Sequence, residues 1–379
     1  MPSPSSNSTW PWITSRAGAA ATPSEREKAL ASLRRFTFQW HLTERCNLRC
    51  AHCYQESYDS PEVGYDAWLE VLGQLERLLA DWRAVSGGPR RLHLTLTGGE
   101  PLVHPDLMRL LDVFADRRDR FSFALLSNGH LLDKVRAHHL ARLGPRYVQV
   151  SLEGTAATHD RIRGPGSFNR VLRAIGELNS VRVPVMISFT AHRGNFREFP
   201  AVAQLAQELG VTRVWTDRLI PRGAGTQGVN GSLTPAETRE YIVLLKSARQ
   251  TARRRWPWWP RKRTEVAQHR ALQFLGGDGR PYRCVAGESL LALLPNGDLL
   301  PCRRMPIRIG NVFESPLRDL YFDHPVLRAL RNPGHIASGC ESCALERLCR
   351  GGLRCLSFAL HGDPFHSDPG CWLPAAVHD

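Results

Sequence analysis

Apolar residues recur along the chain with two periods, and their order predicts strands alternating with helices from residue 36 onward. Short runs rich in β-branched and aromatic residues predict six strands, over 36–43, 91–97, 121–127, 147–152, 184–190 and 211–219. Apolar residues at i, i+3 and i+4 predict six helices, over 64–84, 105–117, 131–143, 168–180, 196–209 and 235–255. In the first of these helices Trp68, Leu72 and Leu75 fall on one face.

This order of elements predicts an α/β fold. Successive strand–helix units favour parallel strands covered by helices, and right-handed crossovers curl them into an open barrel. Six units are fewer than the eight of a closed barrel, so we expect a partial (β/α)6 TIM-like barrel over 36–225. A flexible lead-in with a short helix precedes it over 1–35, a last helix and a basic, aromatic connector follow over 226–280, and a cysteine-rich domain occupies 281–379.

Three cysteines lie within eight residues directly after the first predicted strand, at Cys46, Cys50 and Cys53. A loop of this length can surround one 4Fe–4S cluster and ligate three of its irons. Fe–S clusters usually take four thiolates, so the fourth iron is left open for a small molecule. Taken alone, the loop also fits a zinc site or three unrelated thiols.

The Cys-x3-Cys-x2-Cys spacing, with His52 before the last cysteine, resembles the radical S-adenosylmethionine (SAM) superfamily. In that family SAM chelates the open iron through its amino and carboxylate groups. The second predicted strand ends in a motif that resembles the family's Gly-Gly-Glu-Pro, which holds the SAM amino group: Gly98, Gly99, Glu100 and Pro101. Glycines let a ligand approach the backbone, and a carboxylate accepts hydrogen bonds from an ammonium group.

Polar residues interrupt the ends of the third and fourth predicted strands, at Ser127, Ser151 and Glu153. In parallel barrels the active site lies at the carboxyl ends of the strands, so these residues are expected to line it. The resemblance places Ser151 and Glu153 near the methionyl and ribose groups of SAM. It assigns the SAM carboxylate to an arginine of the next segment: Arg163, or alternatively Arg161 or Arg173.

Two charged stretches keep two interpretations each. On the sixth strand Asp217 and Arg218 either face the substrate or form a structural ion pair. Residues 253–263 combine arginines and tryptophans with prolines that exclude a regular helix. They form a docking surface for an acidic partner or a lip of the substrate channel, or else a linker whose tryptophans cover the seam between domains.

The other seven cysteines lie near the C-terminus and indicate further ligand sets: Cys284, Cys302, Cys340, Cys343, Cys349, Cys355 and Cys371. A hairpin turn predicted at 296–298 brings the first two together. Paired Cys-x2-Cys motifs often bind zinc, which is the alternative to iron. The arrangement resembles the SPASM extension, a cap that carries auxiliary Fe–S clusters beside radical SAM barrels.

The resemblance implies one or two auxiliary clusters. One set has four thiolates: Cys340, Cys343, Cys349 and Cys371. The other has three: Cys284, Cys302 and Cys355. Leu353 stands where the family commonly has a cysteine, and Cys355 substitutes for it as in the pyrroloquinoline quinone branch. The fourth ligand of the three-thiolate set stays open between water, an Asp or His side chain and the substrate.

The composition of the chain indicates the cellular location of the protein and the role of its cysteines. The 379 residues contain no apolar run long enough to span a membrane, and the N-terminus lacks the features of a signal peptide. We therefore expect a cytoplasmic protein whose ten cysteines are ligands rather than a disulfide framework. The net charge of +14 is spread along the chain, which leaves room for an acidic partner, whereas no nucleic-acid module is recognised.

The resemblance implies an oxidoreductase that cleaves SAM to methionine and a 5′-deoxyadenosyl radical, which abstracts hydrogen from carbon. A low-potential donor such as flavodoxin or ferredoxin supplies the electron. We expect a ribosomally made peptide as the substrate, crosslinked or oxidatively matured, as in the pyrroloquinoline quinone and mycofactocin maturases. Residues 1–35 hold no leader-binding domain, so a separate leader-binding protein is expected. The alternatives are a small molecule or tetrapyrrole substrate, because 40–47 resembles haem-biosynthesis relatives, or a zinc-stabilised binding protein.

Overall fold

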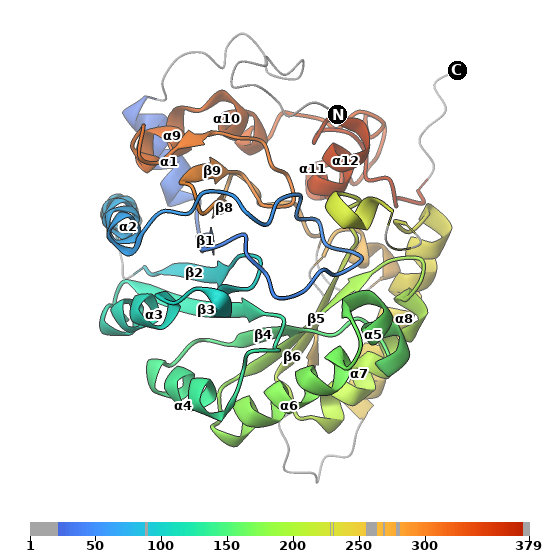
Figure 1. Ribbon diagram of the computed structural model, residues 1–379. Helices are drawn as coiled ribbons and strands as arrows, with labels where there is room; N and C mark the ends of the chain where they lie inside the picture. The colour runs from blue at the N-terminus through green and yellow to red at the C-terminus, as the bar shows by residue number, and fades with distance from the viewer. Residues whose placement is uncertain are drawn as a thin grey trace.

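The computed structural model describes residues 22–373 apart from 88–89, 228, 230, 255–263, 268–269 and 278–280. Its strands form one sheet in the order β10-β9-β8-β1-β2-β3-β4-β5-β6-β7 (Figure 1). The strands are β1 Thr37–His41, β2 Leu92–Thr97, β3 Phe121–Ser127, β4 Val148–Ser151, β5 Val185–Ala191, β6 Arg213–Arg218, β7 Glu265–Val266, β8 Leu290–Leu293, β9 Asp298–Leu300 and β10 Gly310–Asn311.

All six predicted strands are present, and β1 to β6 pair in parallel with sequential neighbours. The helices are α1 Pro23–Ala31, α2 Tyr65–Ser86, α3 Leu107–Asp116, α4 Lys134–Leu143, α5 Ala156–Arg163, α6 Ser167–Ser180, α7 Phe199–Glu208, α8 Pro235–Arg254, α9 Leu317–Asp323, α10 Pro325–Arg331, α11 Glu346–Cys349 and α12 Arg354–His361. Helices α2, α3, α4, α6, α7 and α8 cover the outside of the curved sheet (Figure 1), whereas α5 lies against the cysteine loop, where Ile162 O accepts from Ala51 N at 2.9 Å. The predicted α/β fold is confirmed.

Helix α5 was not predicted, because its sequence lacks an apolar stripe. Its buried residues are Thr158, His159 and Ile162, of which only one is apolar. Helix α2 shows the contrast: a stripe that includes Trp68, Leu72 and Leu75 is buried, and the helix ends at Gly87 in the left-handed conformation (φ 66°). The structure therefore follows the periodic pattern where that pattern exists and departs from it where burial is polar.

The cysteine-rich region extends the sheet of the barrel. Strand β8 pairs in parallel with β1 along Thr37–Trp40, and β9 returns antiparallel beside β8. The predicted hairpin is thus present, with Gly297 at φ 90° in its turn. Strand β7, in the expected connector, adds to the other edge beside β6. The domain boundary at 281 stays a prediction, because one continuous sheet crosses it.

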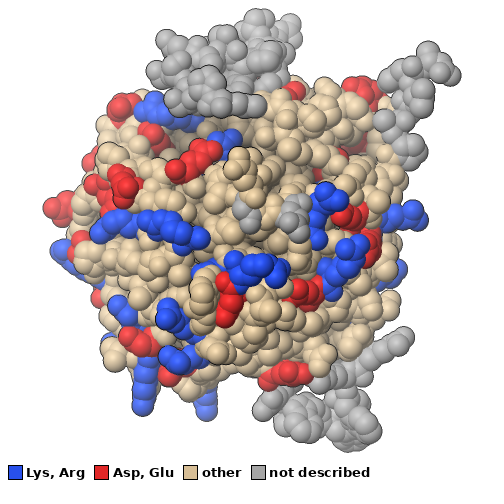
Figure 2. Space-filling model, turned by 45° about the vertical axis from the view of Figure 1, so that its right-hand side comes forward, with Lys and Arg blue, Asp and Glu red and all other residues tan. Residues whose placement is uncertain are grey.

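Charged side chains of both signs are interspersed over the face seen in Figure 2, among large uncharged areas. This agrees with a net charge that is spread along the sequence. Of the helices in the described ranges, none is both long and apolar enough to cross a membrane. The lead-in up to residue 21 and most of the basic, aromatic stretch, 255–263, lie outside the described residues, so the interpretations of both stay predictions.

Candidate functional site

The first cysteine loop follows the carboxyl end of β1, where the ligand side of a parallel barrel lies. Cys46, Cys50 and Cys53 are partly buried and form no disulfide. Burial, with smaller contributions from Glu100, Cys50 and Cys53, raises the pKa of Cys46 to about 11. Burial likewise raises the pKa of Cys50. Three partly buried thiols of one loop, whose thiolates need compensating positive charge, fit an iron cluster.

The two glycines at the end of β2 hold this loop in place. Gly99 N donates to Thr43 O at 2.8 Å, and Glu100 N donates to Arg45 O at 2.9 Å. A Cβ on Gly99 would lie 2.6 Å from Glu44 O, and one on Gly98 would overlap Thr43. The sequence predicted that these glycines admit a ligand, whereas in the structure their backbone packs against the residues that lead into Cys46.

A second pair of glycines packs against the other end of the loop. They lie in the 3-10 helix η4, Gly223–Thr226, after β6. A Cβ on Gly223 (φ 54°) would lie 2.5 Å from Gln55 O and 2.8 Å from Cys53 O. Gly225 N donates to Cys53 O at 3.1 Å. The sequence analysis missed these glycines, although Gly-Ala-Gly directly after a barrel strand is a usable signal.

Glu100 is fully buried beside the loop and joins the ends of β2 and β3. It accepts hydrogen bonds from Ser127 Oγ at 2.9 Å, Asn128 N at 2.7 Å and Leu102 N at 3.1 Å. Burial raises the pKa of Glu100 to about 7. The side-chain amide of Asn128 donates a hydrogen bond to Asn47 Oδ1 at 2.8 Å. The predicted residues Glu100 and Ser127 are therefore tied to the cysteine loop.

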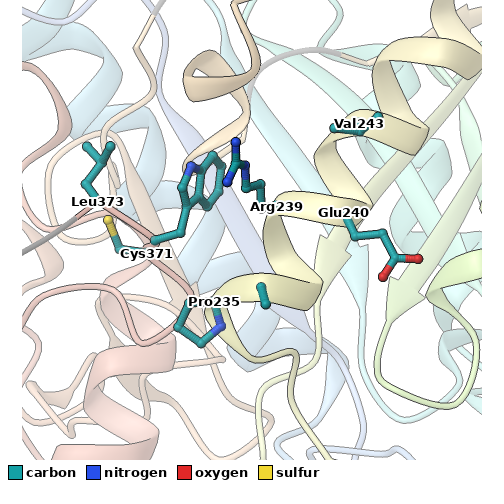
Figure 3. Close-up of a pocket in the computed structure, with 8 residues that line it drawn as sticks. Pro235, Arg239, Glu240, Val243, Cys371 and Leu373 are labelled. Atoms are coloured by element: carbon teal, nitrogen blue, oxygen red, sulfur yellow. The ribbon is translucent and has the colours of Figure 1, made fainter.

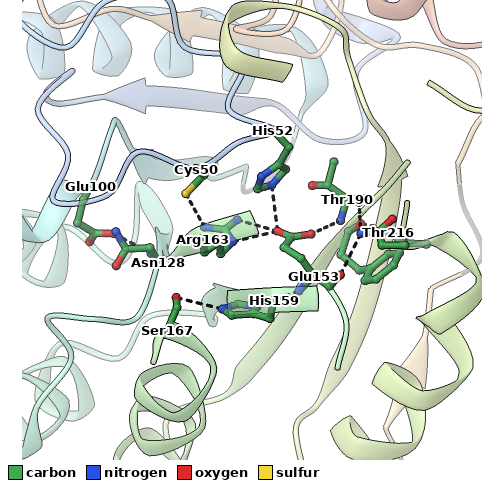
Figure 4. Close-up of polar contacts among 12 residues, drawn as sticks. Cys50, His52, Glu100, Asn128, Glu153, His159, Arg163, Ser167, Thr190 and Thr216 are labelled. Carbon is green, nitrogen blue, oxygen red and sulfur yellow. Dashed lines mark hydrogen bonds and ion pairs between the residues drawn. The ribbon is translucent and has the colours of Figure 1, made fainter. Parts of the chain in front are cut away.

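Glu153 is the centre of a second buried network (Figure 4). Its Oε1 lies 2.7 Å from Arg163 Nη2 and 3.2 Å from His52 Nε2, and its Oε2 accepts from Thr190 N at 2.8 Å. Burial alone would raise the pKa of Glu153, but His52 and Arg163 outweigh it and hold the pKa well below its usual range. The network therefore fixes His52 of the cysteine loop to β4 and β5.

Arg163 extends this network to the first thiols, since its Nη1 lies 3.7 Å from Cys50 Sγ. Of the alternatives for the SAM carboxylate, Arg161 donates to Thr158 Oγ1 at 3.2 Å, and Arg173 is exposed on α6. Ser151 is partly buried at the end of β4, in register with Ser188. The structure thus brings Arg163, and neither alternative, into recorded contact with the cysteine loop.

The C-terminal thiols influence one another's pKa in two groups, and the assignment of these groups as ligand sets stays a prediction. In the first group, burial raises the pKa of Cys302 and Cys355, and the Cys284 thiol raises both further. In the second group, burial, with a smaller contribution from Cys371, raises the pKa of Cys340 to about 11 and that of Cys349 to about 12. Among the described residues, no three His, Cys, Asp or Glu side chains converge tightly enough to chelate a single metal ion.

The profile of the radical SAM superfamily matches residues 40–206, and that of the SPASM iron–sulfur cluster-binding domain matches 284–344. The chain belongs to the radical SAM/SPASM enzymes. The two domains imply that the enzyme binds S-adenosylmethionine and iron–sulfur clusters. The two matches fall on the predicted barrel and on the predicted cysteine-rich region.

Curated relatives of this radical SAM/SPASM enzyme act on different substrates. The AdoMet-dependent heme synthase of Methanosarcina barkeri is 29% identical over 343 residues, covering 88% of this chain and 95% of the relative. The PqqA peptide cyclase of Streptomyces rochei is 29% identical over 353 residues, covering 88% of each chain. These two matches are equally similar, so they establish the enzyme class but do not choose a substrate.

Solved structures share the fold at low sequence identity. Streptococcus suis SuiB bound to its precursor peptide SuiA superposes with a TM-score of 0.70 at 17% identity, covering 92% of this chain and 79% of SuiB. The anSMEcpe protein with bound AdoMet gives a TM-score of 0.69 at 18% identity, covering 89% of this chain and 90% of that one. These similarities confirm the partial barrel with its C-terminal extension.

The sequence left two interpretations of Asp217 and Arg218. The second, an ion pair between their side chains, is wrong, because each side chain pairs with another residue. Arg218 Nη1 lies 2.7 Å from Asp368 Oδ1 in a buried, two-point ion pair. Asp217 forms an ion pair with Arg304. Adjacent residues of a strand point to opposite faces, which is why each finds a partner of its own in this radical SAM/SPASM enzyme.

An open pocket of about 670 Å³ lies between α8 and the end of the four-thiol group (Figure 3). Its lining joins Val243 and Arg239 of α8 to Cys371, Trp372 and Leu373. The pocket borders the second thiol group of the SPASM region rather than the first cysteine loop.

Proposed function

We propose that this enzyme reductively cleaves SAM at the Cys46–Cys50–Cys53 loop and modifies a ribosomally made peptide by hydrogen abstraction. The observation that carries the proposal is the anchored loop: three thiols held from both sides by backbone contacts of Gly99 and Gly225, beside buried Glu100. When bound, the cluster and SAM supply the electron transfer and the carbon radical.

The chain's own residues bind and orient this chemistry. The three thiolates ligate three irons, and Glu100 accepts hydrogen bonds from the SAM ammonium group. Gly98, Gly99 and Pro101 keep Glu100 at that position, and Ser127 and Ser151 line the same end of the sheet. Arg163, beside Cys50, orients the SAM carboxylate, while Glu153 positions Arg163 and His52. Burial of the network excludes water from the reacting groups.

Two comparisons favour a peptide substrate. A relative at 29% identity is a peptide cyclase, and two solved neighbours, SuiB and anSMEcpe, hold peptides. A tetrapyrrole is the second candidate, and the heme synthase relative at the same identity favours it. We favour the peptide because both the curated relatives and the solved structures include proteins named with a peptide.

We further propose that each C-terminal thiol group would hold an auxiliary cluster, which would supply an acceptor for the electron left on the substrate. A flavodoxin or ferredoxin in the cytoplasm supplies the first electron, since the required potential is near the low end of the Fe–S range. A separate leader-binding protein and an acidic peptide stay predictions from the sequence.

Iron and sulfide analysis after anaerobic reconstitution tests the proposal. Wild type should hold about twelve irons, and the variant Cys46→Ala/Cys50→Ala/Cys53→Ala about four fewer, with no formation of 5′-deoxyadenosine. About ten irons in wild type would instead indicate a two-iron site at Cys284, Cys302 and Cys355. Zinc in place of iron would contradict the proposal.

Mass spectrometry of candidate precursor peptides encoded near the gene tests the substrate. A product that has lost hydrogen, formed only with SAM and reductant, supports the peptide. Turnover of an iron porphyrin with no change in any peptide would favour the tetrapyrrole instead.

A further inference from the structure

The inner face of the barrel can be traced at β4 to β6. Val148 and Val150 of β4 belong to the apolar core, so Gln149 between them points to the opposite face. Trp215 Nε1 of β6 donates a hydrogen bond to Gln149 Oε1 although β5 lies between the two strands. Both side chains therefore lie on the concave face, and so does Asp217, two residues after Trp215.

Two arginines from the C-terminal half of the chain share Asp217. Arg304 Nη1 forms an ion pair with Asp217 Oδ2, and Arg270 Nε lies 4.0 Å from the same oxygen. The Asp217 side chain is 5% exposed, whereas those of Arg270 and Arg304 are 31% and 26% exposed. Across the described residues, the ion pairs recorded for both arginines end on this one carboxylate. The accessible side of the cluster is therefore positively charged.

The ring of Trp215 lies beside both of these guanidinium groups. The Arg270 guanidinium lies 4.3 Å from the ring centre of Trp215, and that of Arg304 lies 5.8 Å from it. Arg270 Nη1 also reaches the Tyr282 hydroxyl at 3.5 Å. Stacking on a ring leaves the N–H edges of a guanidinium for a planar acceptor, and a carboxylate matches that edge with two parallel hydrogen bonds.

The cluster lies between the two sets of thiols that the proposed reaction uses. Arg304 is two residues from Cys302, and Tyr54 directly follows Cys53. The guanidinium of Arg303, which lies between Cys302 and Arg304 in the chain, is 5.8 Å from the ring centre of Tyr54. The segment that carries Cys302 and Arg304 thus reaches the residue that follows Cys53, where a substrate would have to lie to meet the radical and an auxiliary cluster.

We propose that Arg270 and Arg304 bind a carboxylate of the substrate beside Trp215, so that the substrate is an acid. The inference rests on the proposed function, because it concerns the substrate of the same site. The carboxylate belongs either to an acidic residue of a peptide or to a propionate of a tetrapyrrole. Arg304 also borders Cys302 and Cys355, so part of its charge serves the thiol group, and Arg270 gives the cleaner test.

The test compares acidic and neutral probes of equal shape on the reconstituted enzyme with SAM and no reductant. One pair is an end-blocked pentapeptide with a central Glu and its Gln counterpart, and the other is coproporphyrin III and its tetramethyl ester. Dissociation constants are measured by equilibrium dialysis for wild type, Arg270→Gln, Arg270→Lys and Arg197→Gln. Arg197 is the matched control, because it also pairs with a carboxylate, of Glu240, and lies 4.4 Å from a ring centre, that of Phe196, but on the outer surface.

In wild type at least one acid should bind about tenfold or more tightly than its neutral counterpart, as expected for hydrogen bonds to a charged group. Arg270→Gln should remove this preference at unchanged iron content, Arg270→Lys should restore part of it, and Arg197→Gln should keep it. A preference in the peptide pair supports an acidic peptide, and one in the porphyrin pair supports a propionate. Equal binding of acid and neutral probes, binding of neither acid, or a preference that survives Arg270→Gln would overturn the proposal.

Formation of 5′-deoxyadenosine with reductant is measured in parallel. Wild type that prefers the acid but forms no 5′-deoxyadenosine would contradict the proposed function and leave the carboxylate site standing. Wild type that cleaves SAM without any preference for the acid would contradict the carboxylate site and leave the proposed function standing. The two proposals therefore fail separately.

Discussion

The first cysteine loop and the C-terminal segment 338–350 hold their cysteines in different ways. The segment carries three cysteines of the four-thiol group: Cys340, Cys343 and Cys349. The first loop has backbone hydrogen bonds to β2 and η4 on its two sides, and its His52 is buried against Glu153. In the C-terminal segment 338–350 every residue is exposed or only partly buried, and α11 buries no residue. Its backbone bonds are largely local, such as Cys343 N to Cys340 O at 3.0 Å.

This difference indicates which of the two sites the polypeptide orders before a ligand binds. Contacts to strands order the first loop before any ligand binds, whereas a segment without buried side chains gains most of its order from the metal that it binds, because metal binding is then coupled to folding. A preformed first loop suits a site that must hold SAM in one orientation during electron transfer. The auxiliary segment has only to hold a cluster.

The largest expected effect on iron content and activity comes from removing the backbone contact of the first loop. Gly99→Ala places a methyl group against the Arg45 and Glu44 carbonyls, so the loop must shift. We expect loss of about four irons and of 5′-deoxyadenosine formation, with the free energy of unfolding lowered by about 1–3 kcal/mol. Iron analysis and thermal unfolding measure both.

Gly176→Ala is the matched control, since this glycine lies inside α6 with no atom within 4 Å of the added methyl group. It should raise the free energy of unfolding by about 0.5–1 kcal/mol through its helix propensity and leave the iron content unchanged. Full iron content and full activity in Gly99→Ala would show that the glycine contact does not order the loop.

Removal of iron with a chelator should separate the two regions next. Hydrogen exchange of the metal-free protein should lose amide protection over 338–350, while β2 and the backbone amides that anchor the first loop keep most of theirs. The comparison within one sample is its own control. Equal loss of protection in both regions would contradict a preformed first loop.

Glu153→Gln tests the buried side of that loop. The substitution leaves Arg163, whose side chain is 10% exposed, without its charge partner, which should lower the free energy of unfolding by about 3–5 kcal/mol. The pKa of Glu153 is lower in the folded protein than its ordinary value of 4.5. Its carboxylate therefore stabilises the fold above that pH, and the contribution is lost as the pH falls below it.

Denaturant unfolding at pH 7 and at pH 4 measures this dependence, which Glu153→Gln should flatten. Glu240→Gln is the control, because Glu240 pairs with Arg197 on the surface, where both side chains are well exposed. That change should cost less than about 1 kcal/mol. Similar losses for the two variants would mean that burial adds nothing to the Glu153 network.

Much of this comparison could be predicted from the sequence, because the motifs are local. The cysteine spacings, the strand–helix order and the hairpin at 296–298 depend on neighbouring residues, and the structure contains the elements that they predict. What was missed depends on distant segments. The pairing of β8 with β1, the packing of Gly223 on Cys53, and the separate partners of Asp217 and Arg218 join residues far apart in the chain, which no local pattern reports.

The smallest expected effect concerns the solvent side of the first loop. Glu62 pairs with Arg45 at 2.8 Å, and the Arg45 side chain is 51% exposed. Glu62→Gln should lower the free energy of unfolding by less than about 1 kcal/mol, because the Arg45 end of the pair is screened by water and salt, and Gln can still accept a hydrogen bond from the Thr43 hydroxyl. Iron content should not change, and the small loss should shrink further at high salt. A loss as large as that of Glu153→Gln would mean that the exposed pair, rather than the buried network, orders the loop, and the contrast between the two thiol regions would then need a different cause.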